Sequence, residues 1–197
     1  NIAEIHEDTY CMFARFEQRG RLYLLYGNHN IVRKKNPAFL EALILQSASM
    51  PEKTLYLTHG HQASLLNSTF WPIARFLVRY FWSPLENLGF LDPTSAAKNY
   101  EVKEKCEESL RSWAEAHHHI LITGHTHRPV LPEEPSFYYN TGSCVHPRCI
   151  TCIEIQRGEL TLVKWTMNAR VDSTLYVARE VISGPVKLLD NGENRSC

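Results

Sequence analysis

Residues 120–127 read ILITGHTH: a short apolar run leads directly into a glycine and two histidines. Two other stretches have the same form, LYLLYGNHN at residues 22–30 and TLYLTHGH at residues 54–61. Each apolar run has the length of a buried strand, and ligands collect at the carboxyl ends of strands in open α/β sheets. The three stretches therefore predict an α/β fold in which histidine-bearing strand ends converge on one site.

Size and composition are those of an ordinary globular domain. The chain has 197 residues, of which 44% are hydrophobic and 21% are charged, enough for one domain with a sizeable core. Lys plus Arg and Asp plus Glu number 21 each, so no basic excess favours a nucleic-acid partner. Six cysteines are too few for a disulfide scaffold and indicate a reducing, cytoplasmic location. No apolar run is long enough to predict a transmembrane helix.

Helices are expected before and between the first two histidine stretches. Apolar residues recur along one face of residues 2–18, which predicts a helix. Asn36 and Pro37 resemble a helix start, because Asn is a favoured cap and Pro is tolerated at the first helical position. We expect that second helix to precede the strand at 54–58.

A helical cap insert is expected between the second and third histidine stretches, over residues 62–117. Its first part is the aromatic segment 70–82, and its second part is a charged amphipathic helix at 98–116. Leu110 and Trp113 are expected on the inner face of that helix.

Beyond the third histidine stretch the pattern changes to β structure. Arg157-Gly158 has the form of a two-residue hairpin turn, and the domain is expected to span residues 1–183 before a polar tail at 184–197. The predicted late strands lie at residues 137–140, 150–156, 159–165 and 176–182.

Histidines and an amide at these strand ends are donors that suit zinc, manganese or iron. Gly124 lets the backbone bend so that His125 and His127 can turn toward one site. Asn28 offers an amide oxygen beside His29, which can donate a proton. Each motif alone is also compatible with surface histidines in a turn, and the metal hypothesis rests on finding three of them together.

The three motifs, in this order, resemble those of the calcineurin-like metallophosphoesterases. Their later motifs are Gly-Asn-His-Asp/Glu, a histidine before Gly-His or Gly-Asp, and Gly-His-x-His, and the resemblance covers about residues 1–165. It implies a four-layer αββα sandwich of two mixed sheets flanked by helices. It also implies two divalent metal ions, manganese, iron or zinc, bridged by a carboxylate and a water or hydroxide.

The same resemblance implies roles for individual residues. Asn28, His59 and His125 would ligate one metal and His127 the other. His29 would act as an acid or electrostatic partner for the phosphoryl group and its leaving oxygen. The implied activity is hydrolysis of a phosphomonoester, phosphodiester or pyrophosphate bond by a water that the two metals activate.

The chain departs from the family pattern in two places. Asn30 stands where an acidic residue usually follows the motif histidine, and it could orient His29 without supplying a charge. The early motifs Asp-x-His and Gly-Asp-x-x-Asp do not occur, and His6-Glu7-Asp8 has the wrong order to replace them. We therefore expect a further β-α-β unit of about 30 residues upstream, and a chain that alone holds one metal and is inactive. The alternative is a non-catalytic scaffold on the same fold that binds a protein partner.

The insert gives the best indication of a substrate. Arg75 and Arg79 lie within the aromatic segment, so the insert could be a lid whose arginines bind phosphate. It resembles the insert of the UDP-2,3-diacylglucosamine hydrolase branch, although this chain has His61 where that branch has Asp. The expected substrates are phosphorylated small molecules, nucleotides or lipid-linked phosphates. A cap that packs its aromatics internally and a peripheral membrane or oligomer contact remain alternatives.

Two further histidine-containing segments have competing interpretations. Cys144, His146, Cys149 and Cys152 could form a second zinc site, but a strand through 150–156 would place the last two cysteines on opposite faces. The other interpretation is that Asn140-Thr141-Gly142-Ser143 forms a turn near the main site. His146 and Arg148 would then be substrate contacts, alongside His61 and Arg128. Residues 117–119 are three histidines that we interpret as a helix end.

Overall fold

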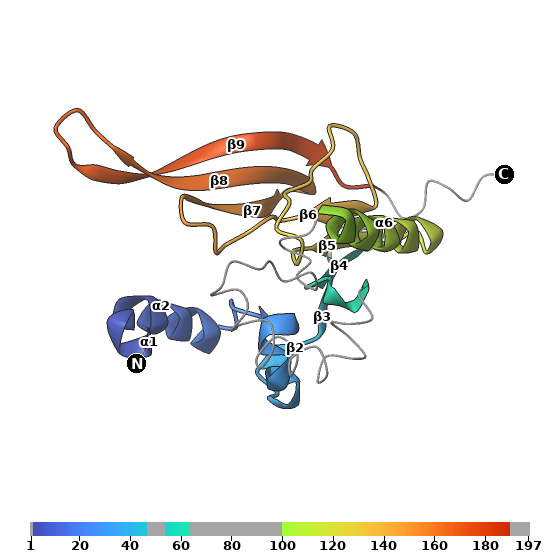
Figure 1. Cartoon of the computed structure of the whole chain (residues 1–197), viewed down its shortest axis with the longest axis horizontal. Coiled ribbons are helices and arrows are strands. Elements are labelled where there is room, and N and C mark those ends of the chain that lie inside the picture. Colours follow the sequence, from blue (N-terminus) through green and yellow to red (C-terminus); the bar gives the residue numbers. More distant parts are fainter. Residues whose placement is uncertain (1, 47–53, 64–99, 190–197) are drawn as a thin grey trace, which may run out of the picture.

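The computed structural model describes residues 2–46, 54–63 and 100–189. Within these ranges the chain is mixed α/β, with sheets flanked by helices (Figure 1). The helices are α1 (Ile2–Ile5), α2 (Glu7–Gln18) and α6 (Tyr100–Ala116), with 3-10 helices η1 (Asn28–Lys35) and η2 (His61–Ala63). The strands are β1 (Leu24–Leu25), β2 (Phe39–Leu40), β3 (Ala42–Gln46), β4 (Thr54–Thr58), β5 (Ile120–Thr123), β6 (Tyr138–Asn140), β7 (Cys149–Gln156), β8 (Glu159–Ala169) and β9 (Leu175–Lys187).

A four-stranded sheet in the order β3-β4-β5-β6 forms the centre of the fold. β4, β5 and β6 are parallel, and β3 is antiparallel to β4. All four residues of β5 are buried, as expected for a parallel strand that is covered on both faces. β4 and β5 confirm the strands predicted immediately before two of the histidine motifs.

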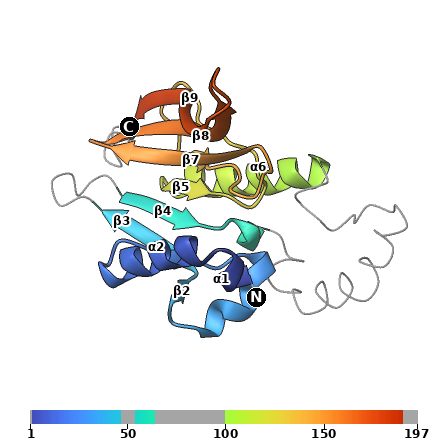
Figure 2. The same ribbon diagram turned by 90° about the vertical axis from the view of Figure 1, so that its left-hand side faces the viewer.

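The central sheet is covered by a helix on one face and by a second sheet on the other. α6 packs on the first face, and the antiparallel meander β7-β8-β9 packs on the second; Figure 2 shows the meander beside β5. Ile120 and Leu160 are fully buried between the two sheets, and burying an aliphatic side chain of this size contributes about 1.5–3 kcal/mol. The helix-side core consists of Cys106, Leu110, Ala114, Leu121 and Tyr138.

The prediction of a helix that starts at Asn36 is wrong. The Asn36 side chain does accept a hydrogen bond from the backbone N–H of Ala38, at 3.0 Å, as a helix cap would. The chain then forms β2, which pairs with β1, and β3, which pairs with β4 along its whole length. Pairing with distant strands therefore overrides the local capping signal, because strand formation depends on tertiary context.

The two other predicted helices are only partly as expected. The helix at 2–18 is divided at His6 into α1 and α2, and Phe13 on its apolar side stays 47% exposed. α6 confirms the charged helix, but Trp113 is 43% exposed and does not belong to its inner face. That face is set by the four-residue spacing of Cys106, Leu110 and Ala114.

The late strands are present; β6 is one residue shorter than predicted, and β7, β8 and β9 are longer. Arg157 and Gly158 both have positive φ, 53° and 78°, which confirms the hairpin turn between β7 and β8. β8 and β9 continue beyond β7 as a two-stranded arm (Figure 1). β9 runs through Gly184 to Lys187, and Val186 is buried in the core. Residues 184–187, expected to begin a polar tail, are therefore part of the sheet.

Candidate functional site

Three segments that follow strands meet at one edge of the central sheet. Asn28 begins η1 after β1, His59 follows β4, and His125 follows β5. The Asn28 Oδ1 atom lies 3.1 Å from the His59 Nε2 atom, and the rings of His59 and His125 have centroids 5.2 Å apart. The structure thus brings together the three residues expected to share one metal.

His61 lies inside this cluster and is almost completely buried, with 2% exposure. Its ring centroid is 5.5 Å from that of His59 and 6.5 Å from that of His125. Burial lowers the pKa of His61 below its usual value, although the nearby Glu41 acts in the opposite direction. Within the part of the chain that the structure describes, the His61 Nδ1 atom is buried without a hydrogen-bond partner. Burial therefore favours the neutral form by lowering the pKa of the imidazole, and the 2% exposure of His61 restricts direct contact with a substrate.

Gly27 allows the first and second motifs to approach each other. A Cβ atom on Gly27 would lie 2.6–2.8 Å from three atoms of the His59 ring, closer than real Cβ atoms come. The Gly27 backbone N–H also donates to the Asn30 side-chain oxygen at 2.6 Å. Asn30 therefore fixes the start of η1 through its side-chain carbonyl oxygen. The side chain of His29 lies outside the described residues.

The loop after β5 holds both of its histidines in an unusual backbone conformation. His125 and His127 have φ values of 39° and 59°, in the left-handed region that costs L-residues roughly 1–2 kcal/mol each. The Gly124 backbone N–H donates to the His59 carbonyl at 3.1 Å, which joins this loop to the second motif. Such a conformation persists only where the surroundings enforce it.

A buried polar network provides that enforcement. The Asn140 side-chain NH₂ donates to the Gly124 carbonyl at 2.8 Å and to the Thr126 hydroxyl oxygen at 3.1 Å. The Thr126 hydroxyl in turn donates to Glu107 of α6 at 2.6 Å. Asn140 and Thr126 are fully buried and Glu107 is 6% exposed. The sequence places Asn140 only in a turn near the main site, without a role for its side chain, and gives no indication of Glu107.

Replacing Asn140 with alanine is expected to destabilise the protein by about 2 kcal/mol, because the Gly142 N–H, now bonded to the Asn140 side-chain oxygen, would become buried without a partner and the Gly124 carbonyl would lose one of its donors. Urea unfolding followed by circular dichroism measures this change. The matched control is Asn168→Ala in the exposed part of β8, expected to change stability by less than about 0.5 kcal/mol. Equal stability of the two variants would contradict the proposed role of the network.

The other predicted site residues are distributed differently. Arg128 contacts the site network, since its guanidinium lies 3.5 Å from the Glu107 carboxylate. His146 and Arg148 are exposed, and the His146 Nδ1 atom accepts the backbone N–H of Arg148 at 3.2 Å, so they form a local turn. Arg75 and Arg79 lie outside the described residues.

The cysteine and histidine segments outside the cluster have structural explanations. Cys149 pairs with Thr166 and Cys152 with Val163 in the ladder between β7 and β8. Their separation of three residues places them on opposite faces, as predicted, so they cannot share a metal within the strand. His117 follows the end of α6 and its Nδ1 atom lies 2.7 Å from the Trp113 carbonyl, which confirms the helix-end interpretation.

Comparison with known proteins gives no assignment: no protein-family model, curated protein or solved structure matches the chain. The function must therefore be argued from the site itself. Among the described helices, none is both long and apolar enough to cross a bilayer.

The donors of the cluster are imidazole nitrogens and an amide oxygen. In the described ranges, no three His, Cys, Asp or Glu side chains form a ready metal-binding group. Of the three ligands expected for one metal, only His59 and His125 belong to these four residue types. The third ligand is the side-chain amide of Asn28. The 3.1 Å approach of the Asn28 Oδ1 and His59 Nε2 atoms brings two of these donors side by side, and nitrogen and oxygen donors suit zinc, manganese and iron.

Glu41 is a carboxylate close to the histidines, and it is hydrogen-bonded to the Tyr26 hydroxyl. Burial raises the pKa of the Tyr26 hydroxyl to about 12, with a hydrogen bond to the Glu41 carboxylate as the second cause. Tyr26 packs against His61, with ring centroids 6.0 Å apart. Glu41 therefore supports the wall of the site, and the described part of the cluster presents imidazole and amide donors.

Proposed function

We propose that this chain carries the later motifs of a metal-dependent phosphoesterase, which hydrolyses a phosphomonoester, phosphodiester or pyrophosphate bond. The observation that carries this proposal is the convergence of Asn28, His59 and His125 from three strand ends. The absence of a Cβ atom at Gly27 lets the Asn28 Oδ1 and His59 Nε2 atoms lie within hydrogen-bond distance, and donors this close can serve one cation. The finer fold assignment, a four-layer αββα sandwich, is part of the same proposal and is compatible with the helix–sheet–sheet packing.

In the proposed site, Asn28, His59 and His125 bind one divalent ion and His127 binds the other. Bound manganese, iron or zinc ions supply positive charge that stabilises the phosphoryl group and activates water. The protein's own contribution is to hold these donors rigidly, through Gly27 and through the Asn140–Thr126–Glu107 network. We assign His29 to protonation of the leaving oxygen.

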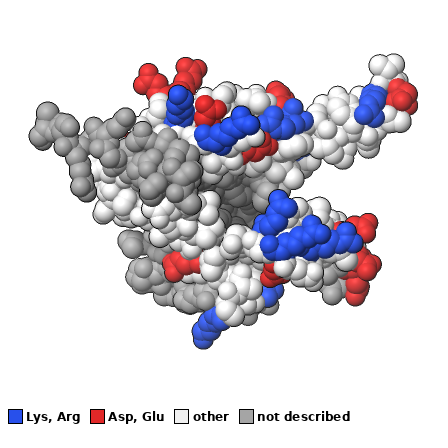
Figure 3. Space-filling view, turned by 180° about the vertical axis from the view of Figure 1, so that it is seen from behind, with Lys and Arg blue, Asp and Glu red and all other residues white. Residues whose placement is uncertain are grey.

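The charge distribution agrees with a small phosphorylated substrate. On the face shown in Figure 3, basic and acidic side chains lie beside one another, and the whole chain has a formal net charge of zero. Nucleic-acid binding relies on a surface of concentrated positive charge. We therefore propose a phosphorylated small molecule, a nucleotide or a lipid-linked phosphate as substrate.

The experiment that tests this function uses the complete gene product, stripped of metal by a chelator and assayed with an aryl phosphate monoester and an aryl phosphate diester. We expect turnover of at least one of them to appear when Mn²⁺ is added and to disappear when the chelator is restored. A complete protein that binds Mn²⁺ but turns over neither ester would contradict the proposal and favour a scaffold that binds a protein partner.

A further inference from the structure

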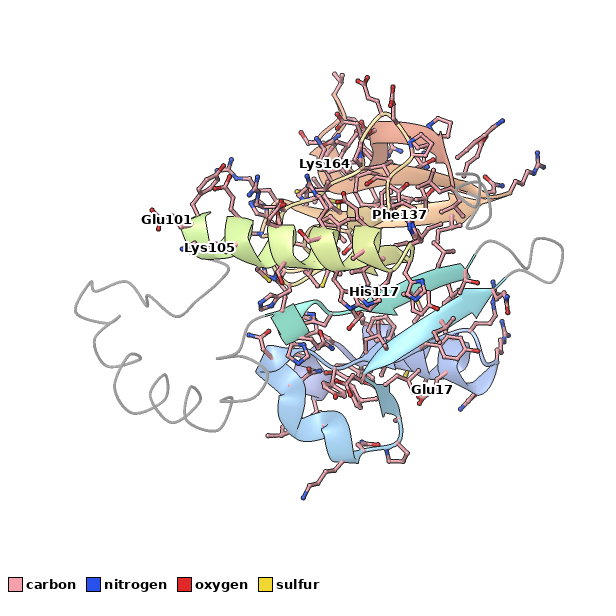
Figure 4. The ribbon with its side chains drawn as sticks, turned by 90° about the vertical axis from the view of Figure 1, so that its right-hand side faces the viewer. Glu17, Glu101, Lys105, His117, Phe137 and Lys164 are labelled. Carbon is pink, nitrogen blue, oxygen red and sulfur yellow. The ribbon has the colours of Figure 1, made fainter. Side chains whose placement is uncertain are left out.

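A second candidate site lies along the N-terminal half of α6. It is a pocket of about 550 Å³ that is lined by charged side chains. Figure 4 shows Glu101 and Lys105 toward this end of α6, and His117 beyond its other end. Arg128, the residue directly after His127, borders the pocket. The pocket therefore adjoins the loop that carries two of the proposed metal ligands. The lining residues are Glu104, Lys105, Glu107, Glu108, Arg111 and Arg128.

Arg128 is held in place at the edge of this pocket. Its guanidinium carbon lies 5.2 Å from the centre of the Tyr100 ring, and one of its nitrogens lies 3.5 Å from the Glu107 carboxylate. Glu107 is itself fixed by the Thr126 hydroxyl. The Arg128 side chain nevertheless keeps 37% of its surface exposed, so it is oriented in advance and still accessible to a ligand.

Two more cations line the pocket without a carboxylate partner. The ion pairs found among the described residues leave out both Lys105 and Arg111. The guanidinium of Arg111 lies 5.9 Å from the centre of the Tyr138 ring. Tyr138 is buried in the core beneath α6, whereas Arg111 itself is exposed. Both side chains are therefore available to bind an anion from solution.

The acidic residues of the pocket are mostly engaged elsewhere. Glu107 binds Thr126 and Arg128. Glu104 hydrogen-bonds with the Tyr100 hydroxyl and raises the pKa of that group. Glu108 is exposed and is the remaining carboxylate. The described lining thus contains three carboxylates and three cations, and Lys105 and Arg111 are the cations that form no ion pair among the described residues.

We propose that this pocket binds an anionic group, a phosphate or a carboxylate, that the substrate carries beyond the ester to be cleaved. The inference rests on the proposed phosphoesterase function and narrows its substrate class to esters with a second anionic group. Guanidinium groups bind such oxygens through paired, charge-assisted hydrogen bonds, and Arg111 and Arg128 supply two of them. Specificity then depends on the pocket, while the metal ligands carry out the reaction.

The first test measures anion binding without catalysis. The complete protein is titrated with inorganic pyrophosphate by calorimetry in excess chelator, so that no metal contributes. We expect saturable binding that Arg111→Ala weakens by about tenfold, since a charge-assisted hydrogen bond contributes on the order of 1.5–3 kcal/mol. Arg15→Ala, which removes an exposed arginine from α2, is the matched control and is expected to bind pyrophosphate as the unmodified protein does.

The second test measures substrate preference. Phosphate release is followed with hexane-1,6-diol bisphosphate and with hexyl phosphate, which lacks the second anion. We expect Arg111→Ala to raise the ratio of the two KM values, bisphosphate over monophosphate, by about tenfold, and Arg15→Ala to leave the ratio unchanged.

The two tests separate the pocket from the phosphoesterase activity. Loss of pyrophosphate binding in Arg111→Ala, in a protein that hydrolyses no ester, would support the anion pocket and contradict the proposed function. Hydrolysis by a protein whose pyrophosphate affinity is the same with and without Arg111 would support the function and overturn the pocket. Absence of any saturable binding of pyrophosphate to the unmodified protein would also overturn it.

Discussion

Replacing His125 with alanine is expected to lower kcat/KM of the complete, Mn²⁺-loaded protein by about a thousandfold. A metal ion contributes several kcal/mol to transition-state stabilisation in such reactions, and each 1.4 kcal/mol changes the rate tenfold. His125 is 5% exposed and its ring lies 5.2 Å from that of His59. No neighbouring donor on the same loop can take its position, because the network of Asn140 and Thr126 fixes the backbone.

The measurement compares initial rates on an aryl phosphate ester, together with Mn²⁺ affinity by calorimetry. The matched control is His117→Ala, which removes an exposed histidine at the end of α6 and is expected to keep full activity. Metal affinity should fall with His125→Ala and remain unchanged with His117→Ala. Full turnover by His125→Ala would remove His125 from the metal-ligand set.

The parts of the fold that could be predicted are those whose signal is local. β4 and β5 were predicted from their sequence because both faces of each strand are covered, so that nearly every residue is apolar or β-branched. The hairpin turn was predicted because Arg157-Gly158 lies between two strand-like segments and glycine favours such turns. Both residues have the positive φ that a two-residue turn of this kind requires. β3 was predicted incorrectly because its strand conformation comes from pairing with β4, while Asn36 gives a local helix signal.

In the site, too, the residues within local motifs could be predicted, whereas the residues that support them from other parts of the chain could not. Asn28, His59 and His125 were identified because glycine and histidine directly follow apolar runs. Asn140 ends a predicted strand, as a polar residue after two buried tyrosines, and this position predicted a turn near the site but not the hydrogen bonds of its side chain. Glu107 gave no such signal, because α6 contains several glutamates and only the packing of the helix shows which one reaches Thr126.

Residues around the cluster also explain how its imidazole and amide donors are held close together. Glu107 and Glu41 are acidic residues near the cluster, and each is bound to another side chain, Thr126 and Tyr26 respectively. They therefore fix the walls of the site. Supporting hydrogen bonds of this kind typically change metal affinity by about 10–100-fold when they are removed.

Replacing Gly27 with alanine is expected to lower Mn²⁺ affinity and kcat/KM by about a hundredfold with little loss of stability. The new Cβ atom would lie 2.6 Å from the His59 Nε2 atom, against the 3.4 Å of an ordinary contact, so the ring must move by about 0.8 Å. Displacing a reacting or ligating group by about 1 Å costs on the order of 10²-fold in rate. The backbone of Gly27 is extended, with φ of −117°, and alanine adopts this conformation without strain.

Gly20→Ala is the matched control for Gly27→Ala, and it should have the opposite effect. Gly20 has a φ of +63° and no atom within 4 Å of its would-be Cβ atom, so alanine is strained there by about 1 kcal/mol without touching the site. Calorimetric Mn²⁺ titration and urea unfolding of both variants measure the two effects independently. Unfolding of Gly27→Ala with unchanged metal affinity would show that Gly27 serves the fold. Loss of metal affinity in a stable Gly27→Ala protein requires that the approach of η1 to the His59 ring sets the spacing of the donors.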